Sequence, residues 1–160
     1  MEYSTDLKIA VAQRKKNKKT IAKLVQLPTK KVDVLFHEKH DEVFEVIDCL
    51  SCANCCKTTS PIFRTVDIDR LSKRLKMNSA AFVKQYLKID NENDYVLQSS
   101  PCPFLLDDNK CSVYEDRPLA CKEYPHTNRK KMQQILSLTR KNTEICPAVS
   151  RIFQDLNTYT

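Results

Sequence analysis

The chain has 160 residues and a formal net charge of +7, and it contains eight cysteines but no glycine. The absence of glycine removes the Walker loop, the GxGxxG dinucleotide-binding turn and the nucleophile elbow, so ordinary nucleotide- and dinucleotide-dependent enzymes are not expected. No stretch approaches the roughly 18 consecutive apolar residues of a membrane helix, and no apolar run follows the N-terminus as in a signal peptide. We therefore expect a cytoplasmic protein without a membrane span.

The positive charge is concentrated near the N-terminus. Residues 1–40 hold ten Lys or Arg against four Asp or Glu, whereas the rest of the chain is almost neutral. All the cysteines lie in the neutral part, from Cys49 onward. We therefore predict a basic helical extension over residues 1–45 and a cysteine-cluster domain over residues 46–160.

Two amphipathic helices are predicted before the first cysteine. Apolar residues at a spacing of three to four indicate a helix over residues 6–27, although the basic run RKKNKK at Arg14–Lys19 interrupts the apolar stripe. Pro28 ends this element, because proline lacks the N–H that a helix needs. A second helix over residues 30–47 has one apolar face and leads directly to Cys49.

The remainder of the chain reads as shorter elements joined by irregular loops. The stretch 101–126 is dense in proline and cysteine, which indicates an irregular loop rather than a long helix. We predict helices over 66–76, 79–88, 128–141 and 147–156, a short helix near 118–122 and a strand over 94–98. The expected fold is mainly α with minor β and irregular metal-binding loops, as a small single cysteine-cluster domain preceded by the basic helices.

The cysteines form two groups. The first is a C-x2-C-x2-C-C run, and the second is spread over the C-terminal half of the chain. Disulfides are rare in a reducing compartment, so we favour metal or cluster binding over a disulfide scaffold, which is the alternative. Two residues between thiolates is also the spacing at which a tight loop directs both sulfurs to one metal. The predicted ligands are Cys49, Cys52, Cys55, Cys56, Cys102, Cys111, Cys121 and Cys146.

The spacing leaves two kinds of metal centre open. The first three cysteines match the C-x2-C-x2-C start of the bacterial ferredoxin run, but Thr59 stands where the fourth ligand should be. Thr59 also breaks the C-x3-C-x2-C pattern of radical S-adenosylmethionine enzymes. The Cys102-Pro103 and Cys146-Pro147 pairs resemble the Cys-Pro that closes a ferredoxin cluster. Eight thiolates equally fit two tetrahedral zinc sites, so the choice only leans toward iron–sulfur.

Other residues have possible supporting functions. His37, His40 and His126 could complete a metal site, although solvated surface positions are the commoner fate of such histidines. Arg117 could offset the charge of an anionic centre by donating to thiolate sulfurs, or it could form an ordinary ion pair with a neighbouring acid. The basic run Arg14–Lys19 could contact nucleic acid or an anionic membrane surface, with a solvated helix face as the simpler interpretation.

Several segments together resemble a known family. The run CLSCANCC is followed by PIFRTVDIDRLSKRL, AAFVKQYL, SPCPFLLDDNKCSVYEDRPLACKEYP and a late Cys-Pro. This order is similar to that of the YkgJ-like cysteine cluster (CxxCxxCC) family, which is described as zinc- or iron-chelating proteins. The resemblance spans about Cys49–Cys146 and implies that the eight cysteines are the shared ligand set. It does not cover the basic N-terminal segment.

Three functions follow from these observations. The first is an accessory protein that holds an iron–sulfur cluster or one to two zinc ions for folding or electron transfer, with an unidentified protein partner. The second, based on the resemblance, is a cluster-dependent oxidoreductase or protein-methylating enzyme, since flagellin lysine N-methylases belong to that family. The third is a zinc-stapled module that binds nucleic acid through its basic helix.

Overall fold

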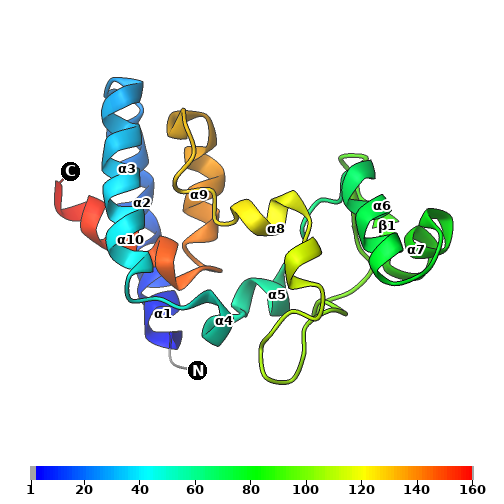
Figure 1. The fold of residues 1–160 in the computed structure, drawn as a ribbon. Helices are drawn as coiled ribbons and strands as arrows, with labels where there is room; N and C mark the ends of the chain where they lie inside the picture. Colours follow the sequence, from blue (N-terminus) through cyan, green and yellow to red (C-terminus); the bar gives the residue numbers. More distant parts are fainter. Residues whose placement is uncertain (1–2, 160) are drawn as a thin grey trace. The chain divides into compact units, whose positions relative to one another are not determined.

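A computed structural model describes residues 3–159. The chain divides into two compact units, each of which is described by itself: unit 1 comprises Met1–Cys52 and Pro125–Thr160, and unit 2 comprises Ala53–Tyr124 (Figure 1). The fold is mainly helical with one small two-stranded antiparallel sheet, which confirms the predicted fold class. The proposed division into residues 1–45 and 46–160 stays a prediction. No helix in the described part of the chain is long and apolar enough to cross a membrane.

Unit 1 is built around its C-terminal helix. Helix α10 contacts α1, α2, α3 and α9, and its buried face includes Val149, Ile152, Phe153 and Leu156. Phe153 meets Phe36 of α3 edge to face, with ring centroids 6.2 Å apart. The elements of unit 1 are α1 (Ser4–Ala12), α2 (Arg14–Leu24), α3 (Thr29–Phe44), α4 (Cys49–Cys52), the 3-10 helix η2 (Met132–Ile135), α9 (Leu136–Asn142) and α10 (Pro147–Tyr159).

Polar contacts also attach α1 to α10. Arg151 donates from Nε and Nη2 to the two carboxylate oxygens of Asp6, at 3.1 and 3.0 Å. The neighbouring Ser150 hydroxyl donates to the Asp6 carbonyl at 2.6 Å. A bidentate Arg–carboxylate pair fixes direction as well as distance, so it sets how α1 lies on α10.

Unit 2 packs two helices against a small sheet and the cysteine-bearing loops. Its strands pair antiparallel, with Leu87 opposite Leu97 and Ile89 opposite Tyr95. The elements of unit 2 are α5 (Asn54–Thr58), α6 (Thr65–Arg74), α7 (Ser79–Tyr86), β1 (Leu87–Ile89), β2 (Tyr95–Leu97), the 3-10 helix η1 (Tyr114–Asp116) and α8 (Leu119–Glu123).

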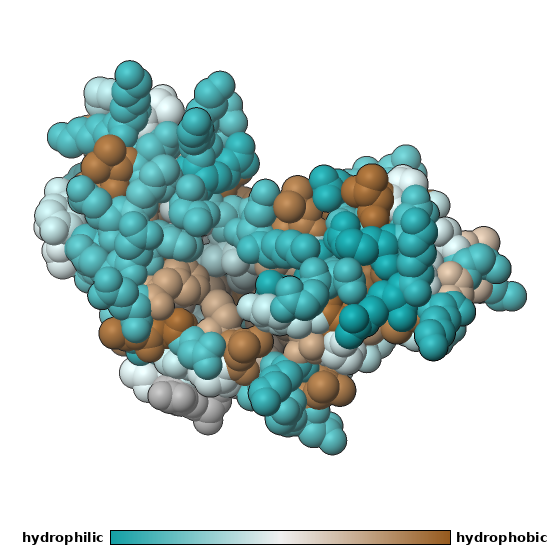
Figure 2. All heavy atoms as spheres, in the orientation of Figure 1, coloured by the Kyte–Doolittle hydropathy of each residue, from teal (hydrophilic) through white to brown (hydrophobic). Residues whose placement is uncertain are grey.

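An aromatic cluster forms the core of unit 2. Phe82 stacks on Phe104 at a centroid distance of 6.2 Å and lies 5.1 Å from Tyr86, which in turn lies 5.0 Å from Phe104. Cys102 and Cys111 pack against this core cluster. Burial of apolar side chains therefore positions two of the predicted ligands directly. The surface of both units is largely hydrophilic in the view of Figure 2.

The observed elements differ from the predicted ones in three places. The helix expected over 6–27 is broken at Gln13, whose φ and ψ are −95° and 12°. The helix expected over 79–88 ends at Tyr86, because the chain continues as strand β1, which was not predicted. This strand pairs with β2, which lies within the strand predicted over 94–98. The helix expected over 128–141 begins later, since Lys131 adopts a left-handed conformation and only η2 and α9 follow it.

Left-handed backbone positions are taken by residues other than glycine. Asn93 and Asn109 have positive φ, as expected for asparagine, whereas Asn78 instead caps α7 by accepting the Ala81 N–H at 2.8 Å. Four further residues also adopt positive φ: Ala53, Lys76, His126 and Lys131. Each such position costs roughly 1–2 kcal/mol for a residue that carries a Cβ.

Glycine at one of these positions should stabilise the protein. Lys76 has φ of 56° just after α6, and the next residue, Met77, donates its N–H back to the Ser72 carbonyl at 3.0 Å, which closes the helix end. We expect Lys76→Gly to raise the free energy of unfolding by about 1 kcal/mol, since glycine adopts positive φ without steric cost. Urea denaturation measures this change.

The matched control for this change lies within α7. Lys84→Gly removes the same side chain from a helical position and should lower the free energy of unfolding by about 1 kcal/mol. Equal effects of the two substitutions would contradict the assigned backbone conformation.

Candidate metal centre

The eight cysteines are distributed over both units, and none of them forms a disulfide in the described part of the chain. The C-x2-C-x2-C-C run is itself divided, because the boundary between the units falls between Cys52 and Ala53. Unit 1 contains Cys49, Cys52 and Cys146, and unit 2 contains Cys55, Cys56, Cys102, Cys111 and Cys121.

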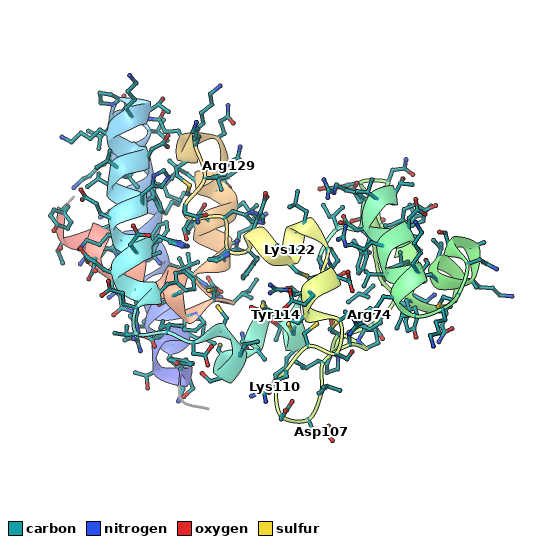
Figure 3. The ribbon with its side chains drawn as sticks, viewed as in Figure 1. Arg74, Asp107, Lys110, Tyr114, Lys122 and Arg129 are labelled. Carbon is teal, nitrogen blue, oxygen red and sulfur yellow. The ribbon has the colours of Figure 1, made fainter. Side chains whose placement is uncertain are left out.

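A tight hairpin brings Cys102 and Cys111 together in unit 2. Leu105 forms an antiparallel bridge with Cys111, and the Ser112 N–H donates to the Phe104 carbonyl at 2.8 Å. Asn109 reverses the chain at the far end with φ of 67°. In Figure 3, the labelled Lys110 and Asp107 lie in this hairpin. The fold thus places both cysteines at the closed base of one loop.

The same hairpin is attached to α5, the helix that carries Cys56. The Cys102 N–H donates to the Cys56 carbonyl in α5 at 2.8 Å. This contact joins residues 46 positions apart in the sequence without the help of any side chain. It sets the backbone of Cys56 beside that of Cys102.

Nearby backbone N–H groups affect the ionisation of three predicted ligands. The N–H groups of Phe104 and Leu105 partly offset the rise that burial causes in the pKa of Cys102, and the N–H of Val113 does the same for Cys111. In unit 1, the N–H groups of Ala148 and Val149 at the start of α10 oppose the rise in the pKa of Cys146. Hydrogen bonds to sulfur favour the thiolate, which is the form that binds metal, and they are among the contacts that tune metal–thiolate centres.

A buried carboxylate positions the helix that carries Cys121. Asp67 is fully buried in α6 and accepts the N–H of Leu119, the first residue of α8, at 3.3 Å. Arg70 donates to Asp67 at 2.8 Å and to the Arg117 carbonyl at 2.8 Å. These bonds fasten the loop before α8 to α6, and α8 carries Cys121.

The charge of Asp67 is compensated locally. Burial alone would raise the pKa of Asp67, but hydrogen bonds from Arg64 and Arg70 outweigh that effect and hold it well below its usual value. Arg64 donates from Nε at 3.0 Å and from its backbone N–H at 3.1 Å. Asp67 therefore stays ionised across the ordinary pH range, and its anionic bonds to Arg70 and Leu119 persist with it.

The thiols of unit 2 differ in how readily they ionise. A hydrogen bond from the Cys55 thiol lowers the pKa of Cys56 to about 7. Burial raises the pKa of Cys102 to about 11 and that of Cys121 to about 12, and the other thiolates raise both further. These raised pKa values disfavour several thiolates in unit 2 at the same time. The positive charge of a bound cation would lower the pKa values again.

Arg117 acts on the cysteines through its charge. Its guanidinium lies 3.6 Å from the centre of the Tyr114 ring, and its Nε donates to the Tyr114 carbonyl at 2.7 Å. The positive charge lowers the pKa of Cys56, Cys111 and Cys121. Within residues 3–159 it forms no ion pair with a neighbouring acid, so electrostatic support of the cysteine loops is the alternative that the structure favours.

The cysteines of unit 1 form a separate group. Asp48 caps α4 through its side chain, which accepts the Leu50 N–H at 2.9 Å, and this helix presents Cys49 and Cys52. Burial raises the pKa of Cys146 to about 12, and the charges of Cys49 and Cys52 raise it further. These three thiols are thus electrostatic neighbours within one unit.

The thiols of the described residues are not arranged as a ready-made metal site. Among residues 3–159, no three Cys, His, Asp or Glu side chains form a group that could hold a metal ion in its present arrangement. The two cysteine groups are therefore defined by backbone contacts and by the mutual electrostatic influence of their thiols. The donor chemistry fits zinc or iron, because thiolate is a preferred ligand of both.

Two of the histidines have structural contacts instead. The His37 Nε2 donates to the Arg129 carbonyl at 2.8 Å, and the His40 Nδ1 lies 2.7 Å from the Thr127 hydroxyl. Both contacts attach α3 to the loop before η2 within unit 1. His126 lies in the same loop with φ of 63°. Neither of the two contacts of His37 and His40 involves a cysteine.

Sequence reasoning did not find Asp67 or Arg70. The only local signal is Asp67 at the third position of a helix, where a carboxylate commonly caps the N-terminus. The contacts with Arg117 and Leu119 span 47 and 52 residues, and no periodicity reveals pairs at that distance.

Eight cysteines carried on short helices and on the loops beside them are a donor set that suits a thiolate metal site. The chain belongs to the CxxCxxCC family, described as “Putative zinc- or iron-chelating domain”, whose model matches residues 48–147. The match covers more than half of the chain and confirms the family resemblance seen in the sequence. No curated protein sequence and no solved structure matches the chain.

Neutralising Asp67 should destabilise unit 2 in a pH-dependent way. We expect Asp67→Asn to lower the free energy of unfolding at neutral pH by about 2 kcal/mol, since charged hydrogen bonds to two partly exposed arginines are lost. The folded-state pKa is depressed, so this stabilisation is present above the unfolded pKa of about 3.9 and disappears as pH falls through the folded value. Urea denaturation between neutral and acidic pH measures both effects.

The control for this prediction is Asp107→Asn, at an exposed aspartate of the same unit. It should change the free energy of unfolding by less than about 0.5 kcal/mol. A variant at Asp67 that behaves like this control at every pH would show that the buried carboxylate does not stabilise the fold.

Proposed function

We propose that this protein is an accessory metal-binding protein in which Cys56, Cys102, Cys111 and Cys121 hold a zinc or iron centre within unit 2. The hairpin that holds Cys102 and Cys111, together with its backbone hydrogen bond to Cys56, carries this proposal. Thiolates held close to one another on fixed backbone supports can share one metal ion. The proposal assigns the metal a structural or electron-transfer function.

Each residue of this set has a defined contribution. Cys56 is the thiol that ionises most readily, so it offers the first thiolate to an incoming cation. The hairpin carries Cys102 and Cys111. Helix α8 carries Cys121, and hydrogen bonds to Asp67 and from Arg70 fix the backbone at the start of α8. The four side chains would have to rotate for their sulfurs to surround one centre, because they form no such group within the described residues.

The cysteines of unit 1 would form a second group of ligands. Cys146 stands at the N-terminus of α10, where the helix dipole and the N–H groups of Ala148 and Val149 favour a thiolate. Cys49 and Cys52 come from α4. Three protein thiolates match the ligand count of an open zinc site or of a cluster with one exchangeable position. The leaning toward iron–sulfur comes from the Cys-Pro pairs at Cys102 and Cys146.

Metal content of single variants tests this assignment. Protein purified without oxygen should contain zinc or iron, and Cys102→Ser and Cys121→Ser should each lose the metal of unit 2. Because structural metal binding is also folding free energy, on the order of 10 kcal/mol in zinc fingers, both variants and chelator treatment should lower the thermal unfolding temperature. Elemental analysis and calorimetry provide the two measurements.

Cys55→Ser is the matched control, because it removes a thiol outside the proposed set while the serine hydroxyl can still donate to Cys56. It should keep the metal of unit 2. A broad visible absorption together with iron and sulfide would identify a cluster, and zinc without colour would identify a tetrahedral site. Full metal content in both Cys102→Ser and Cys121→Ser would refute the assignment.

A further inference from the structure

Helix α2 carries a purely cationic outer face. The helix contains no acidic residue, and its exposed positions are Arg14, five lysines and Ala22. The lysines are Lys15, Lys16, Lys18, Lys19 and Lys23. Unit 1 holds sixteen Lys or Arg against ten Asp or Glu, whereas unit 2 holds eleven against ten. The excess positive charge of the protein therefore belongs to the unit that contains α2.

The opposite face of α2 is held by a buried amide network. Asn157 of α10 accepts from the Thr20 hydroxyl at 2.5 Å and donates to Asn17 at 2.8 Å and to Gln13 at 3.0 Å. Leu24 is fully buried on the same side. Hydrogen bonds with fixed donors and acceptors specify the rotation of a helix about its axis more strictly than apolar packing does. The network thus keeps the lysines directed outward.

The lysines of this face are not neutralised by the protein. Arg14 is paired, because its Nε and Nη2 each lie 2.7 Å from a carboxylate oxygen of Glu144. Within residues 3–159, none of the five lysines forms an ion pair. A helix whose charged side chains stabilise the fold would pair basic residues with acidic ones three or four positions away. This face leaves them available to a partner.

We propose that the five lysines of α2 form a binding surface for the phosphate backbone of nucleic acid. Charge complementarity identifies a polyanion, and the packing of α2 favours nucleic acid over a membrane. A helix that binds a bilayer surface inserts an apolar face, but the inner face of α2 is polar and is occupied by α10. The proposal does not depend on the metal or on the cysteines.

The proposed surface recognises the negative charge of nucleic acid and not its base sequence. No aromatic side chain is present in α2 to stack on bases, and lysine contacts a phosphate as a point charge. Contacts to the backbone alone give binding that is independent of base sequence and steeply dependent on salt. Five contacts correspond to a slope of about −4.5 in a plot of log affinity against log salt concentration for a duplex.

A triple variant of the whole protein tests the surface. Fluorescence anisotropy with a labelled DNA duplex, a duplex RNA and a single strand is measured between about 50 and 200 mM salt. Lys15→Gln, Lys18→Gln and Lys19→Gln together should weaken binding by about a hundredfold or more at the lower salt and reduce the slope by about 2.7. All three lysines are exposed, and an unchanged thermal unfolding temperature would show that the variant is folded.

Two further variants separate charge at this surface from net charge and from side-chain identity. Replacing Lys76, Lys84 and Lys88 of unit 2 by glutamine removes the same net charge elsewhere, and binding should stay within about twofold. Arginine at positions 15, 18 and 19 should retain binding. Equal loss in the unit 2 variant, unaltered binding in the triple glutamine variant, or binding to phosphatidylserine vesicles without binding to nucleic acid would each overturn the proposal.

Discussion

The fold of unit 2 depends on the placement of one buried charge. Asp67 is fully excluded from water, and an ionised carboxylate in that position is tolerated only when its oxygens are bonded to donors. The donors come from both sides of the unit: Arg64 and Arg70 from α6 and its entry, and the Leu119 N–H from α8. The cysteine loop preceding α8 is therefore fixed by the same requirement that keeps the carboxylate ionised.

The contacts that position the cysteines are distinct from the thiols that are proposed to bind metal. In unit 2, hydrogen bonds accepted by Asp67 and by the Cys56 carbonyl, and one donated by Arg70, place the backbone of the cysteine loops. In unit 1, α4 and the first turn of α10 provide equivalent supports for three thiols.

Much of the helical framework could be predicted from sequence, because apolar periodicity, Pro28 and the Asn78 cap are local signals. The set of cysteines was also visible as a spacing pattern. Their division between units was not, since the C-x2-C-x2-C-C run is continuous in sequence and only the tertiary contacts separate Cys52 from Ala53. Strand β1 was missed because its identity depends on pairing with β2, which is a tertiary contact.

The left-handed residues have a consequence for the lifetime of the protein in a cell. Ala53, Lys76, His126 and Lys131 each hold a backbone conformation that glycine would adopt more easily, so the polypeptide gives up some of its own stability at several places. Without the proposed metal, a chain of this kind would spend a larger fraction of time unfolded, and unfolded chains are removed by proteases. The abundance of the protein would then follow the supply of metal without any dedicated regulator.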